Sequence, residues 1–330
     1  MQKRRLLQSG RQVSAIGLGC MSFAGFYGPA NERDAHATLA AAVDLGIDLL
    51  DTANVYGLGL SEEIIGRFLK HGPSDFAIAT KAGIWRDRTH GNRGFRNDAA
   101  YLRSELEGSL RRLGVEYVDL FYIHRRDPAI EIEEVMGTLL DLKAEGKIGG
   151  IGFSEIAPAS LRRALAVGPV DAVQSEYSLW TRQPDLGLLQ TCEAAGVALV
   201  AYAPLGRGIF ADRMPDPAAF ADTDFRKRNP RFLPPHFDLN MARITAFKDY
   251  AADHGYSSAA LALAWCLARG NHVIPIPGTR TPGHLAECAA GAGIGMTDTM
   301  MAEIEALLPV GWAHGDRYSD DQWNGPERYC

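Results

Sequence analysis

The sequence predicts an α/β protein whose strands close into a (β/α)8 TIM barrel, and three observations favour this fold class. Short apolar runs rich in β-branched residues alternate with longer segments of helical periodicity, which is typical of βαβ units. These runs number eight. The chain of 330 residues also suits a barrel, because such folds commonly run to about 250 residues and beyond as one unit. We therefore expect one barrel domain over residues 1–330.

The predicted strands share a short, apolar composition. In order they are Ile16–Met21, Ile47–Asp51, Phe76–Thr80, Val118–Ile123, Ile148–Phe153, Ala172–Ser175, Ala198–Tyr202 and Val273–Ile276. Helical spacing between them predicts helices over Arg33–Leu45, Asp98–Leu113, Glu131–Glu145, Ala159–Val167, Asp185–Ala195 and Arg243–Arg269. Several of these helices end at a glycine suited to a C-cap, namely Gly46, Gly114, Gly146, Gly196 and Gly270.

An open doubly wound sheet is the rival architecture. Such a sheet normally carries a GxGxxG turn after its first strand. The corresponding segment here, Gly17-Leu18-Gly19-Cys20-Met21-Ser22, lacks the third glycine. The barrel is therefore the favoured interpretation.

Three segments lie outside the repeat. Arg5–Ser14 predicts a small N-terminal β-hairpin that plugs the bottom of the barrel. Leu205–Asn240, a long loop after strand seven that is rich in proline and charge, is suited to a mobile cover over a ligand. The C-terminal tail Gly311–Cys330 concentrates aromatic side chains that either staple the tail to the barrel or line a substrate pocket: Trp312, Tyr318, Trp323 and Tyr329.

Composition excludes several classes of partner. A net charge of -6 gives no electrostatic reason to expect nucleic acid. The N-terminus has no apolar segment of a secretory signal, and the apolar helical stretch Ala259–Ala268 is too short to cross a membrane. Five scattered cysteines without CxxC spacing argue against a disulfide framework and against a metal site. We expect a cytoplasmic protein with a small-molecule partner.

Reactive side chains in such a barrel come from the C-terminal ends of the strands. Asp51 ends the second predicted strand, Lys81 follows the third, His124 follows the fourth, and Tyr56 lies one loop turn after Asp51. Each has a structural alternative when taken singly: a helix cap, a surface ion pair, a core histidine or a packed aromatic. Four such groups at one end of one barrel favour a shared catalytic function.

The chemistry of the four residues suggests an acid–base role. A tyrosine with an ordinary pKa near 10 is a poor acid at neutral pH unless a nearby cation such as Lys81 stabilises its phenolate. Asp51 supplies the counter-ion that a desolvated Lys81 needs, and His124 can hydrogen-bond a substrate oxygen. An acid that protonates a developing alkoxide requires hydride transfer to the carbon, which implies a nicotinamide cofactor.

At these residues the sequence resembles the aldo-keto reductase superfamily, whose aspartate, tyrosine, lysine and histidine are matched by Asp51, Tyr56, Lys81 and His124. The resemblance covers nearly the whole chain and includes Asp51-Thr52-Ala53, Asp119–His124, Gly152-Phe153-Ser154, Gln174, the segment Ala201–Gly206 and Pro275–Arg280. It implies an oxidoreductase that reduces aldehydes or ketones to alcohols, with Tyr56 as general acid. NADPH (NADP+) is the implied cofactor, and NADH is possible.

The resemblance also implies the residues that bind this cofactor. Ser154 and Gln174 would contact the nicotinamide carboxamide and Tyr202 would stack on the ring. The pyrophosphate would lie on Leu205, Gly206 and Gly208, and the adenosine phosphate on Gly278, Thr279 and Arg280. An arginine fork favours a 2′-phosphate, and so NADPH. The chain departs from the common pattern at Glu155, where many members carry asparagine, and at His284 and Cys288.

Two other functions remain open at this point. A lysine at the end of a barrel strand can also be the amine of a Schiff-base aldolase, which would assign Lys81 a different role. The superfamily also resembles the β-subunits of potassium channels, so a regulatory cofactor-binding subunit is the alternative that is not an enzyme. Tyr56 and Asp51 weigh against the aldolase, and no partner-binding appendage is visible in the sequence.

Overall fold

The computed structural model describes residues 1–72, 75–86, 93–222 and 224–329. Its parallel sheet has the strand order β12-β11-β10-β9-β8-β5-β4-β3. The strands are β3 (Leu18–Gly19), β4 (Leu49–Asp51), β5 (Ala77–Ala82), β8 (Val118–Ile123), β9 (Ile148–Ser154), β10 (Ala172–Glu176), β11 (Ala198–Tyr202) and β12 (Val273–Ile276). Edge strands β3 and β12 meet where Gly17 and Gly19 donate to the carbonyls of Pro275 and Pro277, each at 3.0 Å. These bonds close the barrel and confirm the predicted fold class.

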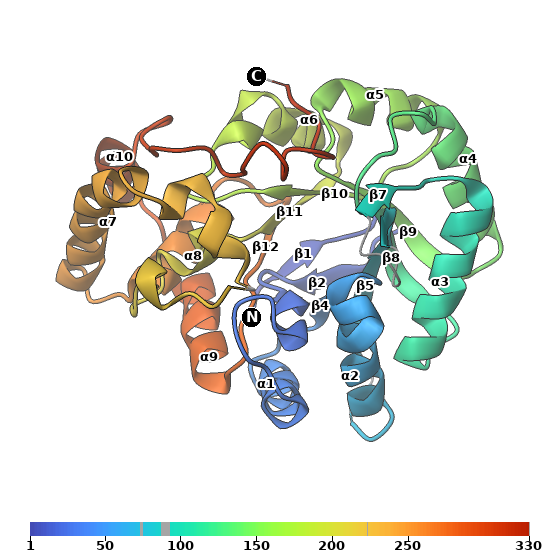
Figure 1. The fold of residues 1–330 in the computed structure, drawn as a ribbon, viewed down its shortest axis with the longest axis horizontal. Helices are drawn as coiled ribbons and strands as arrows, with labels where there is room; N and C mark the ends of the chain where they lie inside the picture. Colours follow the sequence, from blue (N-terminus) through green and yellow to red (C-terminus); the bar gives the residue numbers. More distant parts are fainter. Residues whose placement is uncertain (73–74, 87–92, 223, 330) are drawn as a thin grey trace.

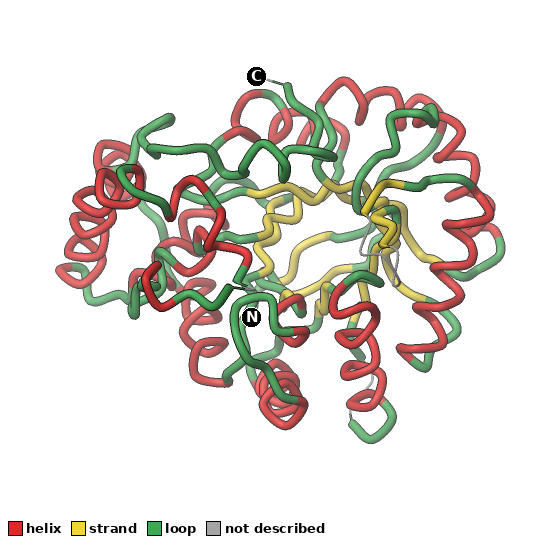
Figure 2. Tube along the Cα trace, viewed as in Figure 1, coloured by secondary structure: helices red, strands yellow, loops and turns green. Residues whose placement is uncertain are grey.

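Helices surround the strands, as Figure 1 shows, and Figure 2 shows the strands enclosed by this ring. In the described chain they are α1 (Glu32–Asp44), α2 (Leu60–Leu69), α3 (Ala99–Leu113), α4 (Ile132–Ala144), α5 (Pro158–Val167), α6 (Leu188–Ala195), α7 (His236–Asp253), α8 (Ser258–Ala268), α9 (Pro282–Ala290) and α10 (Asp298–Leu307). Within the described ranges, no helix is both long enough and apolar enough to span a bilayer.

Local sequence signals explain several helix ends and one wrong prediction. The Asp98 side chain caps the N-terminus of α3 by accepting from the Tyr101 amide, and Gly114 ends the helix with a φ of 70°. The long helix predicted over Arg243–Arg269 is wrong, because the segment forms two helices, α7 and α8. Gly255, with a φ of 75°, turns the chain between them, and Ser257 caps the second.

The predicted N-terminal hairpin is present as the antiparallel pair β1 (Lys3–Arg5) and β2 (Gln12–Ser14). Its turn buries Leu6 and Leu7 among the interior side chains of the barrel strands. Gly150 of β9 makes room for this plug, because a Cβ there would stand 2.4 Å from Leu7 Cδ2. The hairpin therefore closes the N-terminal end of the barrel and leaves the opposite end for ligands.

Loops and the tail build the C-terminal end. A second hairpin, β6 (Ile84–Arg86) with β7 (Arg93–Phe95), follows β5 and was not predicted. The long loop after β11 holds four 3₁₀ turns: η4 (Gly206–Gly208), η5 (Pro217–Ala219), η6 (Phe225–Arg228) and η7 (Pro230–Phe232). After α10 the tail crosses the strand ends, as the red segment of Figure 1 shows. Trp312 anchors it, since its Nε1 donates to the Leu179 carbonyl at 2.7 Å.

Candidate active site

Alternation along the strands delivers the polar side chains of the site. Interior positions such as Leu49, Ala79, Tyr122 and Val200 are apolar and buried in one cluster. Two residues later, at the C-terminal end, the interior positions become polar or aromatic: Asp51, Lys81, His124, Ser154, Gln174, Glu176 and Tyr202. The period of two therefore explains why the predicted residues gather at one mouth of the barrel.

Asp51 and Lys81 form a buried ion pair between neighbouring strands. The Lys81 ammonium donates to Asp51 Oδ1 and, at 2.8 Å, to the Thr52 carbonyl, and the Lys81 side chain has no solvent exposure. Gln174 Nε2 donates to the other carboxylate oxygen at 2.7 Å. Burial disfavours the charge on Lys81, but Asp51 and Tyr56 outweigh it and raise the pKa of Lys81. Lys81 is therefore held as an ammonium at neutral pH.

Tyr56 reaches this pair from the turn that follows β4. Its hydroxyl lies 3.5 Å from Lys81 Nζ. Gly57 and Leu58, with φ values of 62° and 56°, bend the backbone sharply after it. Burial raises the pKa of Tyr56, and the Lys81 charge opposes this rise without reversing it. The Lys81 charge therefore opposes the rise in the pKa of the phenol, and burial sets the net direction.

His124 completes the cluster from the end of β8. Its ring lies 5.8 Å from the Tyr56 ring in an edge-on arrangement of 84°. Burial, with the charges of Arg125 and Lys81, lowers the pKa of His124 well below its ordinary range. His124 is therefore a neutral imidazole, and its Nδ1 is buried with no hydrogen-bond partner among the described residues. We call Asp51, Tyr56, Lys81 and His124, the four residues predicted to be catalytic, the catalytic cluster.

Three predicted nicotinamide contacts lie beside this cluster. Gln174 binds Asp51 directly, and Ser154 Oγ accepts from Arg125 Nη1 at 3.0 Å, which leaves its own hydroxyl proton to donate. The Tyr202 hydroxyl is 2.7 Å from that of Tyr318 in the tail. These side chains come from adjacent strands β9, β10 and β11, so the structure brings them together as predicted.

The residues predicted to bind the cofactor phosphates follow strands β11 and β12. Leu205, Gly206 and Gly208 form the turn after β11, where Gly206 and Gly208 have φ values of 56° and 98°. Arg207 of this turn carries a buried Nη1 with no partner among the described residues. An unpaired donor at this place fits a phosphate ligand.

Gly278, Thr279 and Arg280 lie at the seam of the barrel. Gly278 bridges to Gly19, and the Thr279 carbonyl accepts from Ser22 Oγ at 2.8 Å. The Arg280 guanidinium donates to the Pro29 carbonyl at 2.6 Å. These residues therefore follow β12 and lie beside β3.

The sequence analysis missed a second buried cluster at the mouth, formed by Glu155, Glu176, Arg207 and Arg317. Arg317 of the tail pairs with Glu155 at 2.5 Å and with Glu176 at 3.5 Å, while Arg207 pairs with Glu176 at 2.7 Å. Burial opposes the charge of Glu155, yet Arg317 lowers the pKa of Glu155 to about 2. We call these four residues the tail-anchoring cluster. Glu155 was noted only as a departure from a family pattern; nothing local marked its partner.

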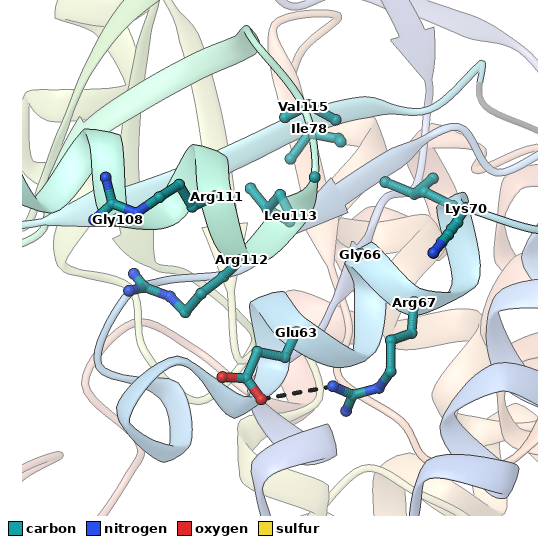
Figure 3. A pocket seen from close by; sticks show the side chains of 12 residues that line it. Glu63, Gly66, Arg67, Lys70, Ile78, Gly108, Arg111, Arg112, Leu113 and Val115 are labelled. Carbon is teal, nitrogen blue, oxygen red and sulfur yellow. Dashed lines mark ion pairs between the residues drawn. The ribbon is translucent and has the colours of Figure 1, made fainter.

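A cavity of about 810 Å³ lies elsewhere, between α2 and α3 on the side of the barrel (Figure 3). Its lining is rich in arginine, but Arg67 pairs with Glu63 and Arg112 with Glu62. It includes no member of the catalytic cluster. The mouth, with its cluster of buried titratable groups, is therefore the candidate active site. In the described part of the chain, no group of three or more histidine, cysteine or acidic side chains is arranged to hold a metal ion.

Comparisons with known proteins identify the family of the chain. Residues 15–309 match the Aldo/keto reductase family. The chain is 36% identical over 311 residues to aldo-keto reductase yakc of Schizosaccharomyces pombe, covering 93% of this chain and 92% of that protein. It is 37% identical over 336 residues to probable aldo-keto reductase 1 of Glycine max, covering 100% and 94%.

Solved structures show the same architecture. Glycerol dehydrogenase AKR11B4 of Gluconobacter oxydans superposes with a TM-score of 0.85 at 32% identity, covering 93% of this chain and 94% of that one. Aldo-keto reductase AKR11C1 of Bacillus halodurans, in its holo form, gives 0.78 at 25% identity, covering 98% and 99%. The chain therefore belongs to the aldo/keto reductase family of oxidoreductases.

Proposed function

We propose that this protein reduces aldehydes or ketones to alcohols with NADPH, and that Tyr56 is the general acid. The observation that carries the proposal is the convergence of the Tyr56 hydroxyl, the Lys81 ammonium at 3.5 Å and the neutral His124 ring at one mouth. The yeast relative is named for NADP(+), which supports the choice of cofactor. When bound, this cofactor supplies the hydride that the carbonyl carbon accepts.

The residues that would hold the cofactor are the predicted ones. Ser154 and Gln174, beside the catalytic cluster, would bind the carboxamide. The turn after β11 would bind the pyrophosphate through Leu205, Gly206 and Gly208. The segment after β12 would bind the adenosine phosphate through Gly278, Thr279 and Arg280. The unpaired Arg207 Nη1 supports a phosphate beside the turn after β11. Arg207 is thus an addition to the predicted set.

Each member of the catalytic cluster has one task in this mechanism. The Tyr56 hydroxyl gives its proton to the carbonyl oxygen, and the Lys81 ammonium stabilises the phenolate that remains. Asp51 keeps Lys81 charged in a buried site. The neutral His124 ring donates its one N–H to the same carbonyl oxygen and orients it toward Tyr56.

The Schiff-base alternative is less well supported. An amine nucleophile must be neutral, and enzymes obtain one by lowering the pKa of a lysine. Here the Asp51 carboxylate and Tyr56 raise the pKa of Lys81 against the effect of burial, and the Thr52 carbonyl accepts a hydrogen bond from another N–H of the ammonium. Lys81 is therefore placed to stabilise an anion rather than to attack a carbonyl.

Replacement of Tyr56 by phenylalanine tests the proposal. We expect carbonyl reduction, followed by NADPH absorbance on a panel of aldehydes, to fall by roughly 10²- to 10⁴-fold, the usual contribution of a general acid. NADPH affinity, measured by fluorescence titration, should stay within about threefold, because the phenol is not among the proposed cofactor contacts. Tyr250→Phe, which removes a surface hydroxyl bonded to Glu303, is the matched control. Near-normal turnover by Tyr56→Phe would contradict the assigned role.

A further inference from the structure

The buried charges at the barrel mouth do not balance. Two ion pairs are balanced, Asp51 with Lys81 and, in the long loop, Asp224 with Arg226. Beyond them, the ends of β8, β9 and β10 with the tail and the long loop bury two carboxylates, Glu155 and Glu176, against four guanidinium groups, Arg125, Arg207, Arg231 and Arg317. Arg207 and Arg317 take both carboxylates. Among the described residues, no carboxylate lies within 4.0 Å of Arg125 or Arg231. Two buried cations therefore lack a counter-ion.

Of these two, Arg125 lies in the active site. It follows His124 directly, and its side chain is only 9% exposed. Its Nη1 donates to the His124 carbonyl at 2.6 Å and to Ser154 Oγ at 3.0 Å. Burial is the main reason that the pKa of His124 is lowered, and the charge of Arg125 is the next cause. The same charge also acts to lower the pKa of Tyr56. Arg231 lies apart and is satisfied by Thr181 Oγ1 at 2.8 Å and the Gly315 carbonyl at 3.2 Å.

The guanidinium of Arg125 retains donors for a ligand. Only Nη1 has hydrogen bonds to described residues, so Nη2 and Nε, one edge of the planar fork, remain. A buried cation without a counter-ion carries a large desolvation cost, which a bound anion offsets. The nearby carboxylate of Glu155 disfavours a dianion and leaves a single charge to be matched.

We propose that Arg125 binds a carboxylate of the substrate, so that the enzyme prefers carbonyl compounds that also carry a carboxylate. The inference rests on the proposed function, because it places the reacting carbonyl against Tyr56 and His124. Arg125 would bind the carboxylate of the substrate, while Tyr56 and His124 act on the carbonyl oxygen of the same molecule. A planar monoanion matches both the fork and the single unpaired charge.

Two pairs of substrates test the proposal: 4-formylbenzoate with its methyl ester, and phenylglyoxylate with its methyl ester. In at least one pair we expect kcat/KM for the wild type to favour the acid by roughly ten- to hundredfold, the range for hydrogen bonds to a charged group. Arg125→Gln should remove this preference, so that the ratio of kcat/KM for the acid to kcat/KM for the ester falls to near one, because the variant loses more on the acid than on the ester. Arg163→Gln, a surface arginine paired with Glu131 and Glu133, is the charge-matched control and should keep the preference.

Two results would overturn the proposal: no preference for the acid in either pair by the wild type, or equal losses on acid and ester in Arg125→Gln, which would indicate a positioning role. Failure of the proposed function would give a different result, because none of the four compounds would be reduced. In that case calorimetric titration of the NADPH-saturated protein with benzoate judges Arg125. Binding that Arg125→Gln abolishes supports the site, and absent or unchanged binding refutes it.

Discussion

The two buried clusters at the barrel mouth are built in different ways. The catalytic cluster joins residues 30 positions apart, Asp51 and Lys81, across adjacent strands, and its one ion pair is balanced. The tail-anchoring cluster joins Glu155 to Arg317, 162 positions along the chain, and its neighbourhood has an excess of positive charge. The first depends on the register of neighbouring strands and on the short turn after β4 that carries Tyr56. The second depends on where a loop and the tail fold back, so it couples the second half of the mouth to distant segments.

The largest expected effect is that of Lys81→Met, which breaks the balanced pair. Asp51 would be left buried without its counter-ion, and we expect the free energy of unfolding at pH 7 to fall by about 3–5 kcal/mol. The loss should shrink at pH 5, because burial already raises the pKa of Asp51 and a protonated carboxyl needs no counter-ion. Urea denaturation at both pH values measures this.

The double variant Lys81→Met with Asp51→Asn separates charge from packing. It should recover part of the lost stability but no activity, since the phenolate of Tyr56 would have no cation beside it. Lys147→Met, at a partly exposed pair with Glu107, is the control and should cost less than about 1 kcal/mol. An Lys81→Met loss no larger than this control would show that the two clusters do not differ as argued.

Glu155→Gln tests the tail-anchoring cluster through its pH dependence. The pKa of Glu155 is lowered from 4.5 to about 2, so ionised Glu155 stabilises the fold above about pH 4.5. This contribution, on the order of 3 kcal/mol, is lost as the pH falls toward 2. We therefore expect the stability difference between wild type and variant, followed by urea denaturation, to be largest near neutral pH and to narrow in acid. Glu305→Gln, at the exposed end of a pair with Arg182, is the control and should cost less than about 1 kcal/mol at neutral pH.

Arg280→Ala probes a residue outside both clusters. If Arg280 binds the 2′-phosphate, NADPH affinity should fall by roughly ten- to hundredfold, while NADH affinity scarcely changes. Stability should change by less than about 1 kcal/mol, because among the described residues Arg280 donates only to the Pro29 carbonyl, at the loop surface. Fluorescence titration with both cofactors measures the effect. Equal losses for the two cofactors, or none for NADPH, would show that Arg280 does not read the phosphate.

The smallest expected effect is that of Tyr318→Phe. It removes the hydroxyl that lies 2.7 Å from the Tyr202 hydroxyl but keeps the ring between Phe225 and Trp323. The loss of one such hydrogen bond should cost about 0.5–1.5 kcal/mol in thermal or urea unfolding. A loss of several kcal/mol would show that the hydroxyl, rather than the ion pairs, fixes the tail.

The barrel and the members of the catalytic cluster were predicted from the sequence. Both follow from short-range patterns, because each strand is an apolar run and its last interior residue sits at a fixed period of two. Asp51, Lys81 and His124 were therefore found from their place after a strand. Prediction was weaker where a local signal competed, as in the segment over Arg243–Arg269, where apolar periodicity obscured the turn at Gly255.

The tail-anchoring cluster and the unpaired charge of Arg125 could not be predicted from the sequence, because both depend on tertiary contacts. No local pattern relates Glu155 to Arg317, because ion pairs between distant segments depend on how loops return over the barrel. The net direction of the Tyr56 pKa was likewise out of reach, since it depends on the competition between burial and the Lys81 charge. Sequence specifies which groups stand at the strand ends. Burial and long-range contact decide their charge states and which of them remain free for a ligand.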